Sequence, residues 1–239
     1  MNIALLTAGG SGNRMGQEIP KQFMCIDNKP IIIYTLQAFQ ISQDIDAIAI
    51  VCIKGWEIFL NAYAKQFNIT KLKWIFEGAE TNQDSIKNGI LGLREAGCSE
   101  EDIILVHDGV RPLVSSEIIS RNIEICEKYG YAVTGLMCKE AIMERVEDNV
   151  HEISIPRERL VRTQTPHTYR LGTLLNAHIE AEQLHIANTV ASCTLFALLG
   201  VKEQHLVLGS EKNGLKLTKP EDVELFKALI HSDPEIWIK

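Results

Sequence analysis

The sequence lacks several features that define large classes of protein. No apolar run approaches the ~20 residues of a membrane-spanning helix, and the N-terminal NIALLTAGG lacks the basic start and long apolar core of a signal peptide. There is no excess of positive charge, since 24 Lys and Arg face 31 Asp and Glu for a formal net charge of -7. Nucleic-acid coats and basic membrane binders need such an excess. We expect a cytoplasmic protein that binds neither nucleic acids nor membranes.

Cysteine patterns typical of metal sites and disulfide frameworks are also missing. The six cysteines lie far apart among 239 residues, with no C-x-x-C pair and no histidine at a metal-ligand spacing. We interpret them as free, mostly buried thiols. A small anionic ligand is still compatible with the acidic composition, because a few cations in one cleft are enough to bind it.

Short apolar, β-branched runs alternate with segments of helical period along most of the 239 residues. This alternation predicts an α/β fold with a mostly parallel central sheet. Strands are predicted at 2–7, 46–53, 73–76, 103–107 and 205–208, and helices at 30–39, 57–67, 84–96, 116–129, 171–183, 192–199 and from 218 onward.

Residues 137–160 differ from the rest of the chain. They form two polar, β-leaning stretches around Asp148 and Asn149, with few large apolar residues to bury. A β-hairpin arm that projects from the body explains this composition better than another layer of core. We therefore predict one domain over residues 1–239 with the arm 137–160 inserted in it.

A glycine-rich loop follows the first predicted strand. Gly10, Gly12 and Gly16 are spaced G-x-G-x-x-x-G, one residue too long for the dinucleotide fingerprint, and no Walker A lysine follows. What remains is a loop whose backbone N–H groups can approach an anion, with Arg14 and Lys21 just beyond it. A plain tight turn is the alternative.

The residues around this loop resemble a known family. LLTAGGSGNRMGQEIPKQF is similar to the A-G-G-x-G-x-R-M-x-x-x-x-P-K-Q-F/Y signature of cytidylyltransferases that activate sugar-alcohol phosphates, among them the methylerythritol phosphate and ribitol-5-phosphate enzymes. Four further blocks match in order, namely GAETNQDSIKNGI, VHDGVRP, RTQTPHTY and GSEKNGLKLTKPEDVELFKAL. The resemblance implies a Rossmann-like nucleotide-diphospho-sugar transferase fold, with helices on both faces of the sheet.

The reaction implied by the resemblance is attack of a polyol phosphate on the α-phosphorus of CTP, with release of pyrophosphate. CTP and a polyol phosphate are thus the expected partners. Because the substrate supplies the nucleophile, catalysis depends on alignment and on offsetting negative charge. The resemblance assigns that role to Arg14, Lys21 and Lys216. A lone lysine is more often merely solvated, but Lys21 follows Pro20 within the motif, and Lys216 precedes a capped helix.

The resemblance also assigns nucleotide contacts, and two of the assigned residues, Ser85 and Asp108, have simpler interpretations as well. Ser85 could equally be an ordinary residue near a helix N-terminus, and Asp108 could be a loop-capping aspartate. Asp108 is otherwise the candidate ligand for Mg2+, which commonly binds one or two carboxylates plus phosphate oxygens. The full set of implied nucleotide-binding residues is Ala8, Gly9, Gly10, Ser11, Gly12, Ala79, Glu80, Ser85, Asp108, Gly109 and Arg111.

The arm matters for the second substrate. In the family it embraces a partner subunit, and an arginine matching Arg157 reaches the partner's site. Thr165, in what looks like a QTP turn, and Glu140 match positions on the same substrate side. The resemblance therefore implies a homodimer formed through residues 137–160, with composite sites.

Three positions depart from the family pattern. Asn82 replaces an arginine, Glu140 replaces an aspartate, and NTVASCTL has no acid where Thr-Asp is usual. These changes leave the identity of the alcohol open, while HDGVRP and ETNQDSIKNG favour ribitol 5-phosphate over methylerythritol phosphate. A non-catalytic CTP-binding homologue is a further alternative. A nicotinamide-dependent oxidoreductase is disfavoured by the glycine spacing.

Overall fold

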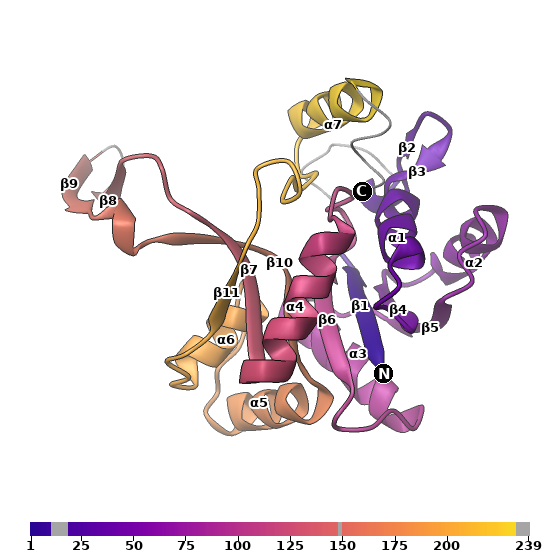
Figure 1. The fold of residues 1–239 in the computed structure, drawn as a ribbon, viewed down its shortest axis with the longest axis horizontal. Helices are drawn as coiled ribbons and strands as arrows, with labels where there is room; N and C mark the ends of the chain where they lie inside the picture. Colours follow the sequence, from indigo (N-terminus) through magenta and orange to yellow (C-terminus); the bar gives the residue numbers. More distant parts are fainter. Residues whose placement is uncertain (11–18, 148–149, 233–239) are drawn as a thin grey trace.

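The structure, a computed structural model, describes residues 1–10, 19–147 and 150–232. Its centre is a seven-stranded sheet in the order β11-β7-β10-β6-β1-β4-β5 (Figure 1). The strands are β1 (Asn2–Ala8), β4 (Ala47–Cys52), β5 (Leu72–Glu77), β6 (Ile103–Asp108), β7 (Tyr131–Met137), β10 (Val161–Arg170) and β11 (His205–Leu208).

The predicted α/β fold with a mostly parallel sheet is confirmed. β1 pairs in parallel with β4 and β6, β4 with β5, and β7 with β11, whereas β10 runs antiparallel to both β6 and β7. All six residues of β4 are buried. A parallel strand covered on both faces is expected to be a continuous apolar run, as AIAIVC is.

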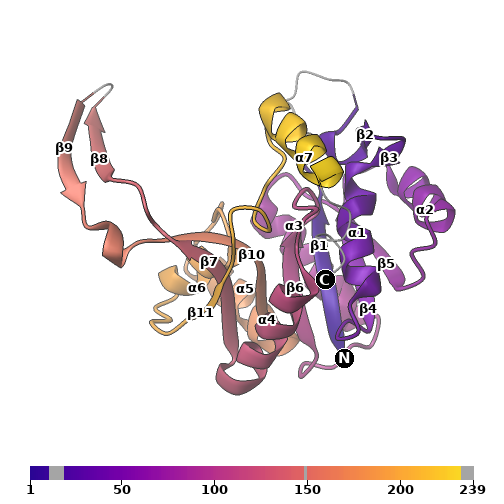
Figure 2. The same ribbon diagram turned by 45° about the horizontal axis from the view of Figure 1, so that its top comes forward.

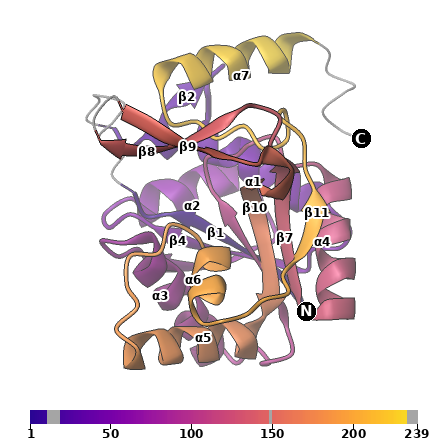
Figure 3. The ribbon, with the colours of Figure 1, turned by 90° about the vertical axis from the view of Figure 1, so that its left-hand side faces the viewer.

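Helices cover both faces of the sheet (Figure 3). Apolar residues of α1 (Ile31–Ile41), α2 (Glu57–Gln66) and α4 (Ser116–Tyr129) pack on one face. Those of α3 (Asn82–Glu95), α5 (Leu171–Gln183) and α6 (Ser192–Leu198) pack on the other.

Helix α7 (Pro220–Ser232) lies over the carboxyl end of the sheet (Figure 2). Its buried Phe226 packs in a small cluster with Leu217 and Val110, and so joins the helix to the loop that follows β6. The same end carries the 3₁₀ helix η2 (Lys21–Phe23) and the short pair β2 (Cys25–Ile26) and β3 (Lys29–Pro30).

Local sequence explains where the main helices begin and end. The Thr81 hydroxyl accepts a hydrogen bond from the Asp84 N–H at the start of α3, and the Ser115 hydroxyl accepts one from the Ile118 N–H at the start of α4. Gly130 ends α4 in the left-handed conformation, with φ of 84°, as glycines commonly do.

The predicted arm is a hairpin that projects from the body (Figures 1 and 2). Strands β8 (Ile142–Glu147) and β9 (Val150–Ile155) pair with each other in a separate two-stranded sheet. A 3₁₀ helix, η3 (Arg157–Arg159), connects β9 to β10. Met143 and Ile153 on the arm are each about half exposed, at 51% and 52%.

Two central strands, β7 and β10, were not predicted from the sequence. The expected QTP turn is wrong, because Thr165 lies within β10, where the register against β7 shifts between Thr163 and His167. β10 escaped prediction because three of its buried residues, Gln164, His167 and Thr168, are polar. Asn122 of α4 satisfies one of these, since its side-chain oxygen accepts a hydrogen bond from the Thr168 hydroxyl at 3.2 Å.

All six cysteines are free thiols, and four of them are buried. Within the described ranges, no helix is both long and apolar enough to cross a membrane.

Candidate active site

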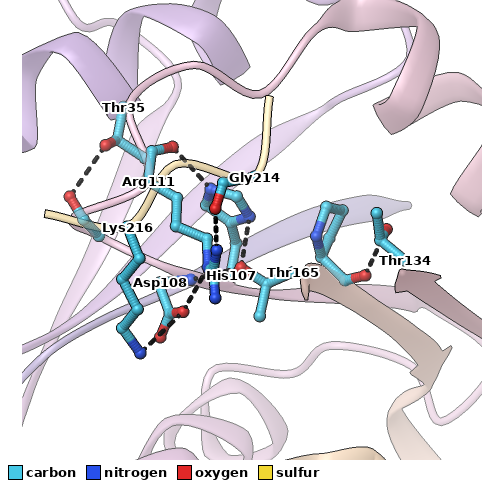
Figure 4. Close-up of polar contacts among 10 residues, drawn as sticks. Thr35, His107, Asp108, Arg111, Thr134, Thr165, Gly214 and Lys216 are labelled. Atoms are coloured by element: carbon cyan, nitrogen blue, oxygen red, sulfur yellow. Dashed lines mark hydrogen bonds and ion pairs between the residues drawn. The ribbon is translucent and has the colours of Figure 1, made fainter. Parts of the chain in front are cut away.

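Charged side chains meet where β6 ends. Asp108 is the last residue of β6, Arg111 lies three residues further on, and Lys216 comes from the segment between β11 and α7 (Figure 4). Arg111 Nε donates to Asp108 Oδ2 at 2.7 Å, and Lys216 Nζ lies 3.0 Å from the same oxygen. Ligands of open α/β sheets bind at this carboxyl edge.

This cluster keeps Asp108 ionised. Burial alone would raise the pKa of its carboxyl group, but the charges of Lys216 and Arg111 lower it further, so the pKa lies well below its usual range. The Asp108 side chain is only 16% exposed, whereas that of Lys216 is 40% exposed. The lysine is therefore the member of the pair that solvent and an incoming anion can reach most easily.

The loop after β6 is held from several directions. Arg111 Nη1 donates to the Gly214 carbonyl, and the Thr35 hydroxyl of α1 donates to the Gly109 carbonyl at 2.9 Å. A Cβ atom on Gly109 would lie 2.7 Å from Ile32 Cδ1 and 3.0 Å from the Thr7 carbonyl oxygen. The Gly109 N–H already donates to that Thr7 oxygen at 3.0 Å. The structure thus gives Gly109 a packing role, and its predicted contact with nucleotide stays a prediction.

A chain of hydrogen bonds through His107 and Thr165 connects the Arg111 carbonyl to the Asp108 N–H. His107 Nε2 lies 3.1 Å from the Arg111 carbonyl oxygen, so Nε2 must donate and Nδ1 must accept. The Thr165 hydroxyl donates to Nδ1 at 3.0 Å, and its oxygen accepts from the Asp108 N–H at 3.1 Å (Figure 4). Neutral His107 therefore fixes both ends of the segment from Asp108 to Arg111.

The start of the glycine-rich loop is anchored by Gln22, which is 1% exposed. Its amide nitrogen donates to the carbonyl oxygens of Ala8, at 2.8 Å, and Gly10, at 3.1 Å. Gln22 lies in η2 beside Lys21, so the same helix that anchors the loop positions the lysine.

Gly9, Ala79 and Ser85, three of the predicted nucleotide-binding residues, lie close together, and their contact with nucleotide stays a prediction. The Ser85 hydroxyl accepts from the Ala79 N–H at 3.0 Å. A Cβ atom on Gly9 would lie 3.1 Å from Ser85 Oγ and 3.3 Å from the Gly78 Cα. Glu80 beside them is exposed.

Other predicted residues do not join this cluster. Glu140 comes just before β8 and Arg157 just after β9, so both belong to the base of the arm, which projects away from the end of β6 (Figure 2). Arg157 is bonded locally, because its Nη1 donates to the Lys139 carbonyl at 2.7 Å. Ser11, Gly12 and Arg14 lie outside the described residues.

Comparisons with known proteins decide the family. Residues 2–232 match the family described as IspD, 2-C-methyl-D-erythritol 4-phosphate cytidylyltransferase. The chain belongs to the IspD family. A similar protein named ribitol-5-phosphate cytidylyltransferase, from Lacticaseibacillus paracasei, is 39% identical over 96% of this chain and 98% of its own. One named 2-C-methyl-D-erythritol 4-phosphate cytidylyltransferase, from Clostridium acetobutylicum, is 36% identical over 96% and 97%.

Solved structures of IspD-type proteins have the same fold. A crystal structure of 4-diphosphocytidyl-2C-methyl-D-erythritol synthase matches with a TM-score of 0.78 at 26% identity, covering 96% of this chain and 98% of that one. The 2-C-methyl-D-erythritol 4-phosphate cytidylyltransferase of Thermus thermophilus matches with a TM-score of 0.73 at 25% identity, again covering 96% and 98%. The predicted nucleotidyltransferase fold is confirmed.

Sequence reasoning missed several residues that shape this IspD-type site. Gln22 and His107 stand inside the quoted motifs PKQF and VHDGVRP, yet neither was singled out. Both act on the backbone rather than on a predicted ligand, and a motif alone does not show that. A polar residue at the end of an apolar run in a strand predicted to be buried, as His107 is in IILVH, is the signal that could have revealed it.

We predict that His107 makes the protein less stable in acid. The ordinary pKa of 6.5 is lowered to about 4, mainly by burial, so between these values the unfolded chain binds more protons than the native one. The contribution of neutral His107 to the free energy of unfolding is therefore fully present above pH 6.5 and is lost as the pH falls toward 4. Between pH 7 and pH 5, the free energy of unfolding measured in urea should fall by about 2 kcal/mol less in His107→Gln than in the wild type. Equal losses in both proteins would contradict this.

Proposed function

We propose that this protein transfers CMP from CTP to D-ribitol 5-phosphate, forming CDP-ribitol and pyrophosphate in the cytoplasm. The observation that carries the proposal is the Asp108–Arg111–Lys216 cluster at the carboxyl edge of the sheet. Relatives named ribitol-5-phosphate cytidylyltransferase, 35% to 39% identical over at least 96% of this chain, support the choice of alcohol.

The chemistry needs no covalent enzyme intermediate. A phosphate oxygen of the polyol phosphate attacks the α-phosphorus of CTP, and the bond between that phosphorus and the oxygen leading to the β-phosphate breaks. The electron pair leaves with pyrophosphate. Lys216, Lys21 and Arg14 offset the charge of two meeting polyanions. Asp108 orients Lys216, and Arg111 holds Asp108 in place.

Asp108 is also the residue that we propose for Mg2+. Across the described ranges, no cluster of three or more His, Cys, Asp or Glu is placed to hold a metal ion. A single ionised carboxylate nevertheless fits Mg2+, which takes its other ligands from phosphates and water. When bound, the ion would neutralise part of the triphosphate charge.

Methylerythritol 4-phosphate is the second candidate substrate. The matching family is described by that activity, and the Clostridium acetobutylicum relative is nearly as similar, at 36% identity. The structure clarifies one departure near the site. The Thr189 hydroxyl donates a hydrogen bond to the side-chain oxygen of Gln83 at 3.0 Å. The next residue, Val190, is 83% exposed.

We further propose that the arm forms a homodimer. Met143, Val146 and Ile153 expose apolar surface along the hairpin, and such surface on a projecting element is typical of an interaction site. The side chain of Arg157, in η3 at the base of the hairpin, is 54% exposed, and the hairpin projects away from the end of β6 (Figure 1). In a dimer, Arg157 and Glu140 on the arm of one protomer would reach the site of its partner, where Thr165 supports Asp108.

A panel of polyol phosphates tests the proposed activity. With CTP and Mg2+, we expect pyrophosphate release with D-ribitol 5-phosphate and loss of that release when EDTA is added. Release only with methylerythritol 4-phosphate would establish the second candidate. Binding of CTP without release for any alcohol would establish the non-catalytic alternative.

The lysines provide a test of the charge mechanism. Lys21→Ala and Lys216→Ala should each lower kcat roughly 100- to 1000-fold, because a preorganised charge contact to the transition state is lost. Lys219→Ala is the matched control, since Lys219 is exposed three residues beyond Lys216. If either active-site variant stayed within a few-fold of wild type, as the control should, its assigned role would be wrong.

Mixing two inactive variants tests whether sites are shared between protomers. Arg157→Ala damages the site that the arm reaches, and Lys21→Ala damages the site of its own protomer. A mixed dimer therefore contains one site with both residues intact. We expect up to about a quarter of wild-type activity from an equal mixture, assuming random assembly and two independent sites. No recovery, with dimers shown by sedimentation to exchange, would argue against sharing.

A further inference from the structure

A small cavity extends inward from the Asp108 cluster. It has a volume of about 160 Å³ and lies between the ends of β6 and β10, the start of α3 and the segment just before α6. Asp108, Arg111 and Lys216 line its charged end, next to Thr165 (Figure 4). The rest of its lining carries no charged side chain and includes Val106, Ile86, Asn82, His167 and Ser192.

Three polar atoms of this uncharged lining have no hydrogen-bond partner within the described chain. They are Ser192 Oγ, His167 Nε2 and Gln164 Oε1, on residues that are only 4%, 2% and 4% exposed, and the Gln164 amide packs against Gly209 and Gly214. Buried polar atoms are normally paired, and each exception in a native protein calls for an explanation. Three exceptions in the lining of one cavity indicate a ligand that supplies the missing partners.

The protonation of His167 defines what it can bind. Its other ring nitrogen bonds to the Gln164 backbone, and burial lowers its pKa to about 4, so the ring is neutral. Because a backbone carbonyl only accepts, Nδ1 carries the proton and Nε2 presents a lone pair. His167 therefore accepts a hydrogen bond, as from a hydroxyl group, and cannot act as a cation for phosphate.

The cavity wall near Ser192 is preformed. Gln83 of α3 donates to the Ile186 carbonyl at 2.9 Å and accepts from the Thr189 N–H at 2.9 Å. These two bonds fix the segment that carries Val190 and Ala191 into the lining. A fixed wall costs little ordering entropy when a ligand binds.

We propose that this cavity holds the carbon chain of the acceptor polyol phosphate, with hydroxyl groups bonded to His167 Nε2 and Ser192 Oγ and the phosphate beside Lys216. The inference rests on the proposed function and deepens it. The charge distribution fits such a molecule, which is anionic at one end and rich in neutral hydroxyls along the rest. Sites with polar groups left unpaired discriminate strongly against analogues that lack the matching hydroxyl.

The ribose of CTP is a second hydroxyl-bearing group that must be distinguished. The predicted base-side residues Ala79, Glu80 and Ser85 are not among those that line the cavity. We therefore assign it to the acceptor rather than to the nucleotide, and steady-state kinetics with each substrate varied in turn separates the two.

Ser192→Ala is the first test variant, because it removes one hydroxyl and little volume. With D-ribitol 5-phosphate as acceptor, we expect its KM for the acceptor to rise roughly 5- to 50-fold, while the KM for CTP stays within twofold. The matched control is Ser42→Ala, since Ser42 is 1% exposed and its hydroxyl is also unpartnered, but it lies at the end of α1 outside the cavity. The control should leave both KM values unchanged.

Deoxy analogues of ribitol 5-phosphate give a second test that does not depend on a variant folding. On the analogue that lacks the bonded hydroxyl, the wild type should show a comparable rise in KM, and Ser192→Ala should add no further penalty. His167→Phe, which keeps a ring but removes the acceptor, should behave in the same way with a different analogue.

The outcomes separate this inference from the proposed function. Wild-type turnover of ribitol 5-phosphate with the acceptor KM unchanged in both cavity variants would overturn the inference alone. A rise in the KM for CTP instead would assign the cavity to the nucleotide and also overturn it. Absence of turnover with every polyol phosphate would overturn the proposed function and the inference together.

Discussion

The site depends on one buried carboxylate held between two cations. Asp108 stays ionised because Arg111 and Lys216 outweigh the cost of taking its charge out of water. The three residues come from the end of a central strand, the loop after it and a segment near the carboxyl terminus. The ion pair of Lys216 with Asp108 and the hydrogen bond of Arg111 to Gly214 therefore join parts of the chain that are about a hundred residues apart. The loop, the α7 cluster and the cavity beside them are all arranged around this interaction.

Much of the fold could be predicted from local pattern alone. β1, β4 and β6 are continuous apolar runs, which strands buried on both faces must be, and α4 is marked by its Ser115 cap and by Gly130 at its end. β10 could not be recognised in this way. Three of its buried side chains, Gln164, His167 and Thr168, are polar, and the partners that make them acceptable, such as Asn122, come from elsewhere in the chain.

The candidate site was predictable to the extent that the residues proposed to bind ligands belong to continuous motifs. Lys216, Asp108 and Arg111 stand in matching blocks, and the structure brings them together. The supporting residues could not be found because their function arises from contacts across the sequence. Gln83 reaches a loop about a hundred residues later, and the His167 lone pair has meaning only once the cavity that surrounds it is known.

The antiparallel course of β10 has a mechanical consequence. The strand begins just after η3 at the base of the arm and reaches Thr165 only eight positions after Arg157. Residues 161–163 pair with β7, the register then shifts, and pairing with both β6 and β7 resumes at His167. Thr165 lies inside this interruption, so the hydroxyl that supports Asp108 belongs to a short stretch of backbone, close to the arm, that the regular ladder does not hold. The arm and the segment around Asp108 are thus connected by only a few residues of the covalent chain.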